Sequence, residues 1–445
     1  SMNDGNLTES GVRILGAGCA GFGAAHQLHS QGVKPVIYEA RDHIGGHTAS
    51  FDYKDGFIFD EGPHISFTKN ERIKTLFAES VEQDFQAFPS RVNNYWQGHW
   101  IKHPAQVNLA GLPRQLIVDC IKDFVHAQNN EYGEIRNYQD WLHAAFGPTF
   151  GDTFPGEYTK KYHTTEAKNL TTDWLGPRLY QPDLEEVLHG ALDKDTQDVH
   201  YIPDFRYPTN GGFVSYLDMF AKKSEVHLDH RVTEIDTREK MLTFSHGGQA
   251  SYEKLISSIP LPALIPLIKD APKDVREAAA LLSCSQVVLI NIGVNRANVS
   301  DCHWTYFYDA DIPFSRLSFP HMFSPHVAPE GCGAIQAEIY FSDKWKPMTG
   351  TLEDWIEPTI QSLMKIGYIQ DREEIIHTST LYAPWGNVIF DHDRPKCLKL
   401  VHDYLKEVGV AYCGRYGDWA YIWTDESFIS GERAANMVMN YGAEA

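Results

Sequence analysis

The sequence predicts an α/β fold in which a Rossmann-like dinucleotide-binding domain is interleaved with a helical domain and an antiparallel sheet domain. Three observations predict it. Residues 12–28 read VRILGAGCAGFGAAHQL, an apolar strand, a glycine turn and a helix of small residues, and a second strand, KPVIYEA, follows. Residues 67–206 carry helical patterns such as LPRQLIVDCIKDFVHAQ. Beyond residue 284, apolar runs such as QVVLINIGV and GAIQAEIYF are typical of strands in an antiparallel sheet.

Composition and charge narrow the class of protein. The chain has 445 residues, 42% of them hydrophobic, which predicts two or three structural units with a sizeable core. Its formal net charge of -20 offers no broad basic surface for nucleic acid or an anionic membrane, and no apolar run is long enough to span a bilayer. Seven cysteines without a Cys-x-x-Cys pair argue against a zinc site or a disulfide framework. We therefore expect no metal and a cytoplasmic location.

The first strand–helix–strand unit has the features of a dinucleotide site. Gly16 permits a tight turn, Gly18 lets the backbone approach a pyrophosphate, and Gly21 lets the helix pack closely on the strand. Glu39 ends the second strand, where a carboxylate accepts hydrogen bonds from ribose hydroxyls. The alternative is an ordinary strand–turn–helix, but both strands and the acid are in place, which favours dinucleotide binding.

A second glycine motif follows and indicates which dinucleotide is bound. In ARDHIGGHTASF, Arg41, Gly45 and Gly46 resemble the second glycine fingerprint of FAD enzymes of the amine oxidase and protoporphyrinogen oxidase superfamily, a GR2-type flavoprotein fold. Paired glycines let a loop cross a pyrophosphate, and an arginine neutralises phosphate charge. The alternative is a Gly-Gly turn with a solvated arginine. HLDHRVTEID, with Val232, resembles the superfamily strand that holds adenine through its backbone.

The C-terminal stretch GRYGDWAYIWTDESFISGERAANMV resembles the superfamily segment that returns to cover the flavin. Asp425 or Ser427 is a candidate cap for a helix whose positive end would favour a reduced flavin. The alternative is a surface helix with an incidental cap. Taken together, the resemblance implies that FAD is bound by Gly16, Gly18, Cys19, Ala20, Gly21, Glu39, Ala40, Arg41, Gly45, Gly46, His47, Gly62, Pro63, His64, Ile65, Val232, Gly414, Arg415, Asp425, Glu426 and Ser427.

Within that superfamily, four short stretches resemble the UDP-galactopyranose mutase family. DEGPHISFT resembles the loop whose histidine lies against the flavin, which implies this role for His64. IPFSRLSFPHMFSPH resembles the stretch whose arginine holds substrate phosphate, here Arg316, and GRYGDWAY the stretch that binds the pyrophosphate, here through Arg415. The resemblance implies that these three residues are catalytic. WLGPR resembles a Trp-x-x-x-Arg stretch, and the implied substrate-binding residues are Arg178, Tyr306, Arg316 and Tyr421.

Each assignment has a plain structural alternative. His64 could be a hydrogen-bonded histidine of the core, and the arginines could form surface ion pairs. The tyrosines could be packing residues. The chain also departs from the mutase pattern at three positions. Thr159 and His163 stand where the family has asparagine and tryptophan, and Val388 stands where it has a phosphate-binding tyrosine.

The implied activity is an FAD-dependent nucleotide-sugar mutase that interconverts pyranose and furanose rings in polysaccharide precursor biosynthesis. Reduced flavin would be the nucleophile and a nucleotide sugar, with UDP as the expected nucleotide, the substrate. The alternatives are a net FAD-dependent oxidoreductase, such as an amine, porphyrinogen or sugar oxidase or a desaturase, and a non-catalytic flavoprotein. The sequence leaves the oligomeric state open.

The same interpretation divides the chain into interleaved segments. We expect the FAD-binding domain to comprise residues 10–66, 207–283 and a C-terminal return, 383–445. Residues 67–206 are expected to form a helical substrate domain that includes short strands, and residues 284–382 an antiparallel-sheet substrate domain.

Overall fold

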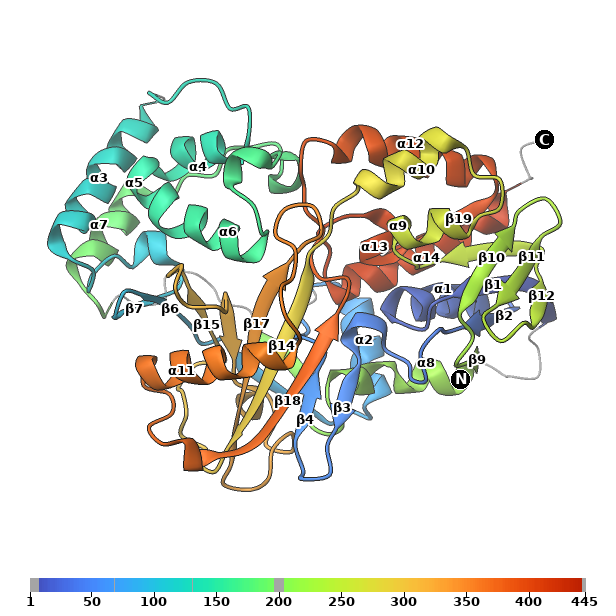
Figure 1. The fold of residues 1–445 in the computed structure, drawn as a ribbon, viewed down its shortest axis with the longest axis horizontal. Helices are drawn as coiled ribbons and strands as arrows, with labels where there is room; N and C mark the ends of the chain where they lie inside the picture. The colour runs from blue at the N-terminus through green and yellow to red at the C-terminus, as the bar shows by residue number, and fades with distance from the viewer. Residues whose placement is uncertain (1–7, 68, 130, 196–203, 442–445) are drawn as a thin grey trace.

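The computed structural model describes residues 8–67, 69–129, 131–195 and 204–441. Figure 1 shows three parts: a parallel sheet between helices at one end, a group of helices from the first half of the chain at the other end, and a long antiparallel sheet between and below them. Helices and strands thus mix along the chain, which confirms the predicted α/β class.

The parallel sheet has five strands in the order β19-β13-β1-β2-β9. Ile14 and Ile256 point to one face and Leu15 and Leu255 to the other, because successive side chains of a strand alternate. Both faces are therefore apolar and covered by helices, as in other parallel sheets. The strands are β1 (Thr8–Leu15), β2 (Val33–Tyr38), β9 (Glu225–His227), β13 (Lys254–Ser257) and β19 (Val410–Tyr412).

The first and last helices pack against each other on one face of this sheet. These are α1 (Cys19–Ser30) and α14 (Thr424–Asn440), drawn in blue and red in Figure 1. A Cβ added at Gly23 would lie 2.0 Å from the Phe428 carbonyl oxygen, and one at Gly431 would lie 1.9 Å from the Ala20 carbonyl oxygen. Only glycine permits this separation, so the two glycines bring both ends of the sequence to the nucleotide-binding face.

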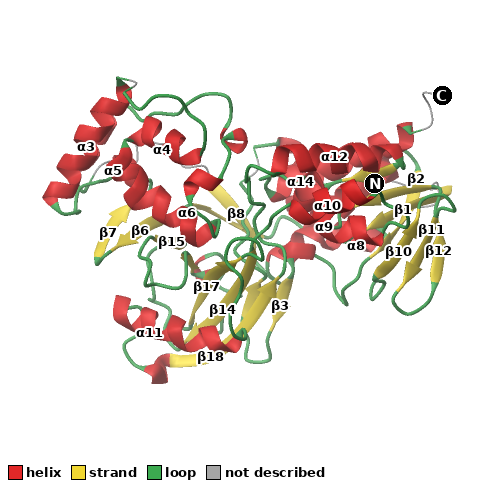
Figure 2. Ribbon diagram, turned by 45° about the horizontal axis from the view of Figure 1, so that its top comes forward, coloured by secondary structure: helices red, strands yellow, loops and turns green. Residues whose placement is uncertain are grey.

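The opposite face is covered by helices from two other regions. They are α9 (Leu261–Leu264), α10 (Lys273–Leu281) and α12 (Arg394–Glu407), whose apolar side chains share a core with Leu15 and Leu255. A three-stranded antiparallel sheet lies beside them, formed by β10 (Val232–Asp236), β11 (Met241–Phe244) and β12 (Gln249–Ser251). Figure 2 shows it at the edge of the nucleotide-binding part.

The antiparallel part is a seven-stranded sheet in the order β18-β14-β17-β16-β15-β6-β7. Only the β15–β6 pair is parallel among these described strands. Helix α11 (Ile356–Ile366) packs on the sheet core. The strands are β6 (Val92–Trp96), β7 (His99–Lys102), β14 (Gln286–Val294), β15 (Trp304–Phe307), β16 (Arg316–Ser318), β17 (Gly333–Phe341) and β18 (Ile375–Ala383).

The helical part extends beyond the β6–β7 edge of that sheet (Figure 1). It contains α3 (Arg114–Gln128), α4 (Tyr138–Phe146), α5 (Pro148–Gly151), α6 (Glu157–Tyr162) and α7 (Leu184–Leu192). The remaining elements are two strand pairs, β3 (Ser50–Asp52) with β4 (Ile58–Asp60) and β5 (Phe85–Pro89) with β8 (Asp204–Pro208), and the helices α2 (Glu71–Ser80), α8 (Asp218–Lys223) and α13 (Gly414–Asp418).

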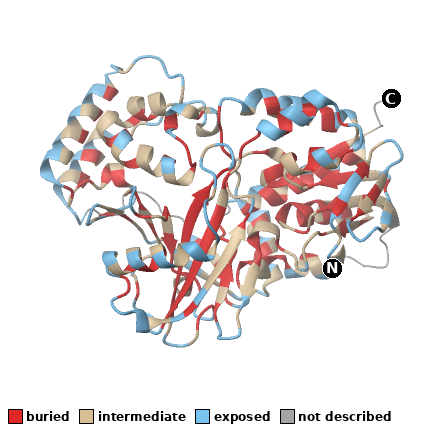
Figure 3. Ribbon diagram, viewed as in Figure 1, coloured by how far each residue is buried: buried red, intermediate tan, exposed pale blue. Residues whose placement is uncertain are grey.

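Burial is deepest in the middle of the large sheet, where Figure 3 shows β14 and β17 as buried along nearly their whole length. Every residue of β17 is buried, including the polar Gln336 and Glu338. A buried charge needs a partner, so Glu338 marks a position where packing alone does not explain the residue. None of the helices within residues 8–441 that the structure describes is long and apolar enough to cross a membrane.

Candidate active site

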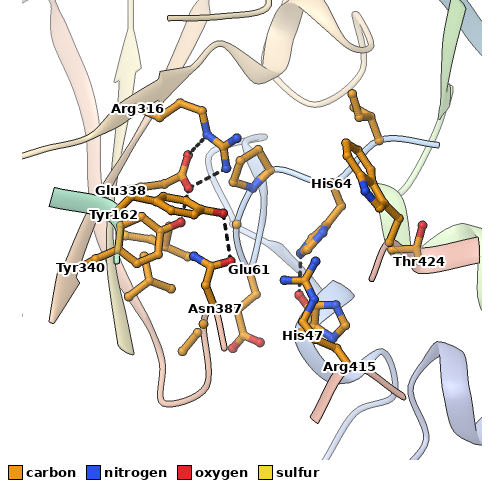
Figure 4. A pocket seen from close by; sticks show the side chains of 18 of the residues that line it. His47, Glu61, His64, Tyr162, Arg316, Glu338, Tyr340, Asn387, Arg415 and Thr424 are labelled. Carbon is orange, nitrogen blue, oxygen red and sulfur yellow. Dashed lines mark hydrogen bonds and ion pairs between the residues drawn. The ribbon is translucent and has the colours of Figure 1, made fainter. Parts of the chain in front are cut away.

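The cavity that contains most of the sequence-predicted substrate residues lies where the three parts meet. It has a volume of about 280 Å³ and is lined by the loop after β4, by α6, by β14 to β18 and by the C-terminal residues 415–424. Figure 4 shows Arg316 and Arg415 on opposite sides of it. Trp304, Tyr306, Trp385, Tyr421 and Trp423 add aromatic walls.

Arg316 is held from behind by a buried carboxylate. Its Nε donates to Glu338 Oε2 at 2.5 Å and its Nη2 to Glu338 Oε1 at 2.8 Å, because the pairing of β16 with β17 sets the two residues opposite each other. Tyr340 donates its hydroxyl to Glu338 Oε1. Burial acts to lower the pKa of Arg316, but the Glu338 carboxylate outweighs burial, so this pKa lies well above its usual range. Arg316 is a compensated cation.

Arg415 is held differently. Its Nε and Nη2 both donate to a neutral acceptor, the Ile422 carbonyl oxygen, at 3.0 and 2.8 Å. Among the residues that the structure describes, no carboxylate forms an ion pair with it. Its guanidinium carbon lies 5.8 Å from the ring centroid of Tyr421, much as that of Arg316 lies 6.0 Å from Tyr306. On both sides of the cavity an arginine therefore lies beside a tyrosine ring, but within the described part of the chain only the charge of Arg316 is balanced by a carboxylate.

His64 and His47 lie beside Arg415. His64 donates Nε2–H to the His47 carbonyl oxygen at 2.8 Å, which fixes the proton on that nitrogen. Burial, and after it Arg415, lower the pKa of His64 to about 4. Burial, then His64 and Arg415, lower the pKa of His47 well below its usual range. Both imidazoles are neutral at neutral pH, so they add hydrogen-bonding groups to this side and no charge.

A third wall of the cavity contains the neighbour of a residue that the family pattern singled out. Val388, which stands in the place of a family tyrosine, is buried in the core of the nucleotide-binding part, and its neighbour Asn387 lines the cavity instead. Asn387 Oδ1 accepts from the Tyr162 hydroxyl at 2.9 Å. Both residues lie in the segment between β18 and α12, where Val388 packs into the core and Asn387 reaches the cavity.

Helix α6 likewise presents a different residue from the two singled out by the family pattern. Thr159 bonds its own helix, with Oγ1 on the Pro155 carbonyl oxygen at 2.7 Å, and His163 is buried against Trp174. Tyr162, one position before His163, faces the cavity. Arg178 is exposed and does not line the cavity, so the structure does not bring it to the other predicted substrate residues.

The glycine motifs of the first 50 residues form a narrow cradle. Gly16 has a positive φ of 109°, and a Cβ on Gly21 would lie 1.9 Å from the Gly16 carbonyl oxygen. Gly45 donates its N–H to the Ala17 carbonyl oxygen at 2.8 Å, so the second motif lies directly against the first. A Cβ on Gly18 would lie 3.5 Å from the Gly45 carbonyl oxygen. Backbone alone lines this gap, as close approach of a pyrophosphate requires.

The acidic and basic groups beside the cradle are already oriented. Glu39 accepts from the Ala17 N–H and the Arg41 N–H, both at 2.9 Å, which aims its carboxylate while leaving further lone pairs. The Arg41 guanidinium pairs with Glu61 at 3.1 Å rather than standing free. Val232 begins β10, shortly after His230, whose N–H donates to the Glu39 carbonyl oxygen. Ala40 connects Glu39 to Arg41.

The C-terminal segment completes the cradle. Gly414 has a positive φ of 82°, and a Cβ there would lie 3.0 Å from the Ala20 Cβ. Helix α14 begins at Thr424 with Trp423 as its cap residue, so Asp425 and Ser427 lie within the first turn and neither is the cap. Glu426 accepts from the Trp423 N–H. The buried Ser427 Oγ has no hydrogen-bond partner, which leaves a polar atom for a bound group.

These observations meet the requirements of a dinucleotide cofactor. The cradle is backbone-lined, the helix α1 begins at Cys19, where the first N–H groups of a helix have no acceptor within the helix, and an unpaired Ser427 Oγ lies at the start of α14. The predicted residues His47, Gly62, Pro63, His64 and Ile65 line the adjoining cavity. Within the described ranges, no group of three or more histidine, cysteine, aspartate or glutamate side chains is placed to hold a metal ion.

Sequence reasoning missed Glu338, Tyr340, Tyr162 and Asn387. One signal was available for the first of them: Glu338 is the only charged letter in GAIQAEIYF, and a charge in an otherwise apolar strand needs a partner. The other three residues gave no such signal, because a tyrosine or asparagine near a strand end is common in any chain.

Comparison with known proteins adds three findings. The family model described as flavin containing amine oxidoreductase matches residues 19–333. The crystal structure of reduced UDP-galactopyranose mutase superposes with a TM-score of 0.89 and 25% identity, over 97% of this chain and 96% of that one. A Klebsiella pneumoniae protein named "Probable UDP-galactopyranose mutase" is 30% identical over 178 residues, 38% of this chain and 45% of its own length.

Oxidoreductases also match. The 15-cis-phytoene desaturase of an Oncidium hybrid cultivar is 43% identical over 68 residues, 15% of this chain. The match covers 12% of that desaturase, so the chain corresponds to only a small part of the curated relatives of this kind.

Proposed function

The chain belongs to the flavin containing amine oxidoreductase family, whose cofactor is FAD, and we propose that it is a nucleotide-sugar mutase that interconverts pyranose and furanose rings. The likeness to reduced UDP-galactopyranose mutase along almost the whole chain supports a mutase over other members of the family. A UDP-linked sugar is the proposed substrate, and polysaccharide precursor biosynthesis the proposed process.

The observation that carries the proposal is the pair of arginines facing each other across one cavity. Arg316 and Arg415 come from segments about 100 residues apart, and each lies beside a tyrosine ring. A diphosphate offers anionic oxygens in two directions, which a planar guanidinium recognises through paired hydrogen bonds. Tyr306 and Tyr421 also line this cavity. An oxidoreductase for apolar or amine substrates has no need of this arrangement.

FAD, when bound and reduced, supplies the nucleophile for the anomeric carbon of the sugar. The chain's own residues bind, orient and exclude water. Arg316 and Arg415 hold the nucleoside diphosphate before and after it separates from the sugar, and the neutral His64 lines the same cavity. Trp304 and Trp385 line the cavity and limit the access of water, which would otherwise capture the separated sugar.

The decisive experiment incubates the dithionite-reduced protein with a panel of nucleotide sugars and analyses the products for furanose isomers. We expect isomer formation with reduced protein, none with oxidised protein, and many turnovers without consumption of reductant. Stoichiometric consumption of oxygen or another acceptor, coupled to a dehydrogenated product, would reject the mutase.

That outcome would instead establish the second candidate, a net FAD-dependent oxidoreductase. The match to a phytoene desaturase and the oxidoreductase family itself favour it. The aromatic walls of the cavity are equally suited to an apolar substrate.

A further inference from the structure

The charges around the cavity are more balanced than two facing arginines imply. The described charged side chains that line it, other than the neutral histidines, are Glu61, Arg316, Glu338 and Arg415. Glu61 pairs with Arg41 and Glu338 with Arg316, in both cases through the two carboxylate oxygens. Arg415 is therefore the one cation of this described lining that no carboxylate compensates.

Glu338 is also unusually well fixed. Its side chain is 1% exposed, it accepts from two nitrogens of Arg316, and Tyr340 donates to Oε1 as well. Arg316 spends its Nε–H and one Nη2–H on this carboxylate, which leaves the Nη1–Nη2 edge of the guanidinium as its remaining fork. Arg316 thus keeps its hydrogen-bonding geometry while Glu338 cancels most of its charge.

We propose that Glu338 is a specificity-determining residue, which lowers the net charge of the cavity so that a free nucleoside diphosphate is held less tightly than two uncompensated arginines would hold it. This inference rests on the proposed function. A mutase has to release its nucleoside diphosphate from the sugar and recombine the two, so a site that trapped the free diphosphate would stall. At neutral pH the free diphosphate carries about one more negative charge than the nucleotide sugar, because its terminal phosphate ionises twice. Charge in the cavity therefore discriminates between the two.

The test is Glu338→Gln, which keeps the shape and one acceptor oxygen and removes the charge. Binding of UDP, of UDP-galactose and of inorganic pyrophosphate to the FAD-containing protein is measured by flavin fluorescence. We expect Glu338→Gln to tighten UDP and pyrophosphate by about tenfold or more and UDP-galactose by less, since one added unit charge at this range is worth over 1 kcal/mol. Rising salt should reduce the gain.

A matched control is Glu432→Gln. Glu432 is buried and forms the same kind of bidentate pair, with Arg72 at 2.6 and 2.7 Å, but lies outside the cavity lining. It should leave all three affinities unchanged. If Glu338 only positioned Arg316, Glu338→Gln would weaken UDP and UDP-galactose equally, and the proposal would be overturned.

A second variant covers the case in which Glu338→Gln fails to fold. The double variant Arg316→Gln with Glu338→Gln removes both charges of the pair, so the ratio of UDP to UDP-galactose affinity should stay within about threefold of wild type while both affinities fall. A larger change in that ratio overturns the proposal. Pyrophosphate separates this inference from the proposed function: if it binds and Glu338→Gln tightens it while neither UDP nor UDP-galactose binds, the charge assignment stands and the nucleotide-sugar function fails.

Discussion

The cavity has an arginine on each of two sides, Arg316 and Arg415, and the two guanidinium groups are held in place by different partners. On the sheet side, a rigid cross-strand pair with Glu338 fixes the guanidinium and neutralises it. On the C-terminal side, the Ile422 carbonyl fixes it and leaves its charge intact. An arginine found by its motif can donate hydrogen bonds to a ligand in either setting, but the group it is paired with decides how much of its positive charge acts on that ligand.

The largest expected effect is on stability and falls on the sheet side. Arg316→Ala leaves Glu338 as a buried, unpaired carboxylate, so we expect the free energy of unfolding to fall by about 3–5 kcal/mol. Arg415→Ala leaves only a half-buried carbonyl, with an expected loss of about 1 kcal/mol. Urea unfolding of the two variants measures both.

The double variant Arg316→Ala with Glu338→Ala is the control for that comparison. Without the unpaired charge, it should regain at least half of the stability lost by Arg316→Ala. Equal losses at Arg316 and Arg415, or no recovery in the double variant, would contradict the difference between the two sides.

The second effect is on ligand affinity and falls on the C-terminal side. Arg415→Ala removes the uncompensated cation of the described cavity lining, so we expect nucleoside diphosphate binding to the FAD-loaded fraction of the protein to weaken by about 2–4 kcal/mol. Arg415→Lys should restore it only in part, because an ammonium group lacks the planar fork. Flavin-fluorescence titration with UDP measures the change.

Arg394→Ala provides the matched control for Arg415→Ala. Arg394 also directs Nε and Nη2 at one backbone carbonyl, that of Trp419, but it lies outside the cavity lining. It should bind UDP as wild type does. A loss at Arg394 as large as that at Arg415 would show that the effect arises from the fold of the C-terminal segment and not from the cavity.

The contrast between the two sides also marks what the sequence could predict. The glycine cradle and the positions of Arg316 and Arg415 could be predicted, because each lies in a short stretch whose residue types indicate its chemistry. The charged letter of Glu338 was visible in the sequence but its partner was not, because the pairing with Arg316 is a matter of strand register between residues 22 positions apart. Asn387 was missed because the family pattern singles out its neighbour Val388, which packs into the core instead. Arg178 was placed by motif alone, and the structure leaves it exposed.

The third expected effect is on the pKa of His64, which should respond differently to the loss of Arg415 and to the loss of Arg316. Burial and then Arg415 lower the pKa of His64 from 6.5 to about 4, whereas Arg316 has the smallest influence of the groups around it. The unfolded chain takes up a proton at this histidine between those two values while the folded chain does not, so stability falls as the pH falls from about 6.5 towards 4. Arg415→Met should raise the pKa of His64 and narrow that window, although burial keeps the pKa below 6.5.

NMR titration of the His64 imidazole measures this shift, and the His64→Gln variant identifies its resonance. Arg316→Met should move the same pKa less. If the two arginine variants shifted His64 equally, the two sides of the cavity would not be electrostatically distinct.

The smallest expected effect concerns the two tyrosines beside the arginines. Tyr306 accepts a hydrogen bond from Trp304 Nε1 at 3.2 Å, whereas Tyr421 is 42% exposed and its hydroxyl bonds to no described residue. Tyr421→Phe should therefore weaken UDP binding by about 0.5–1.5 kcal/mol, the value of a neutral hydrogen bond, without changing the free energy of unfolding. Tyr306→Phe should weaken binding to a similar degree but also destabilise the fold slightly, since Trp304 loses its acceptor. UDP titration and urea unfolding of both variants measure these effects. A loss of stability confined to Tyr306→Phe would extend the difference between the two arginines to the tyrosines beside them. A loss of stability at Tyr421→Phe would instead mean that the C-terminal side of the cavity also contributes to the stability of the fold.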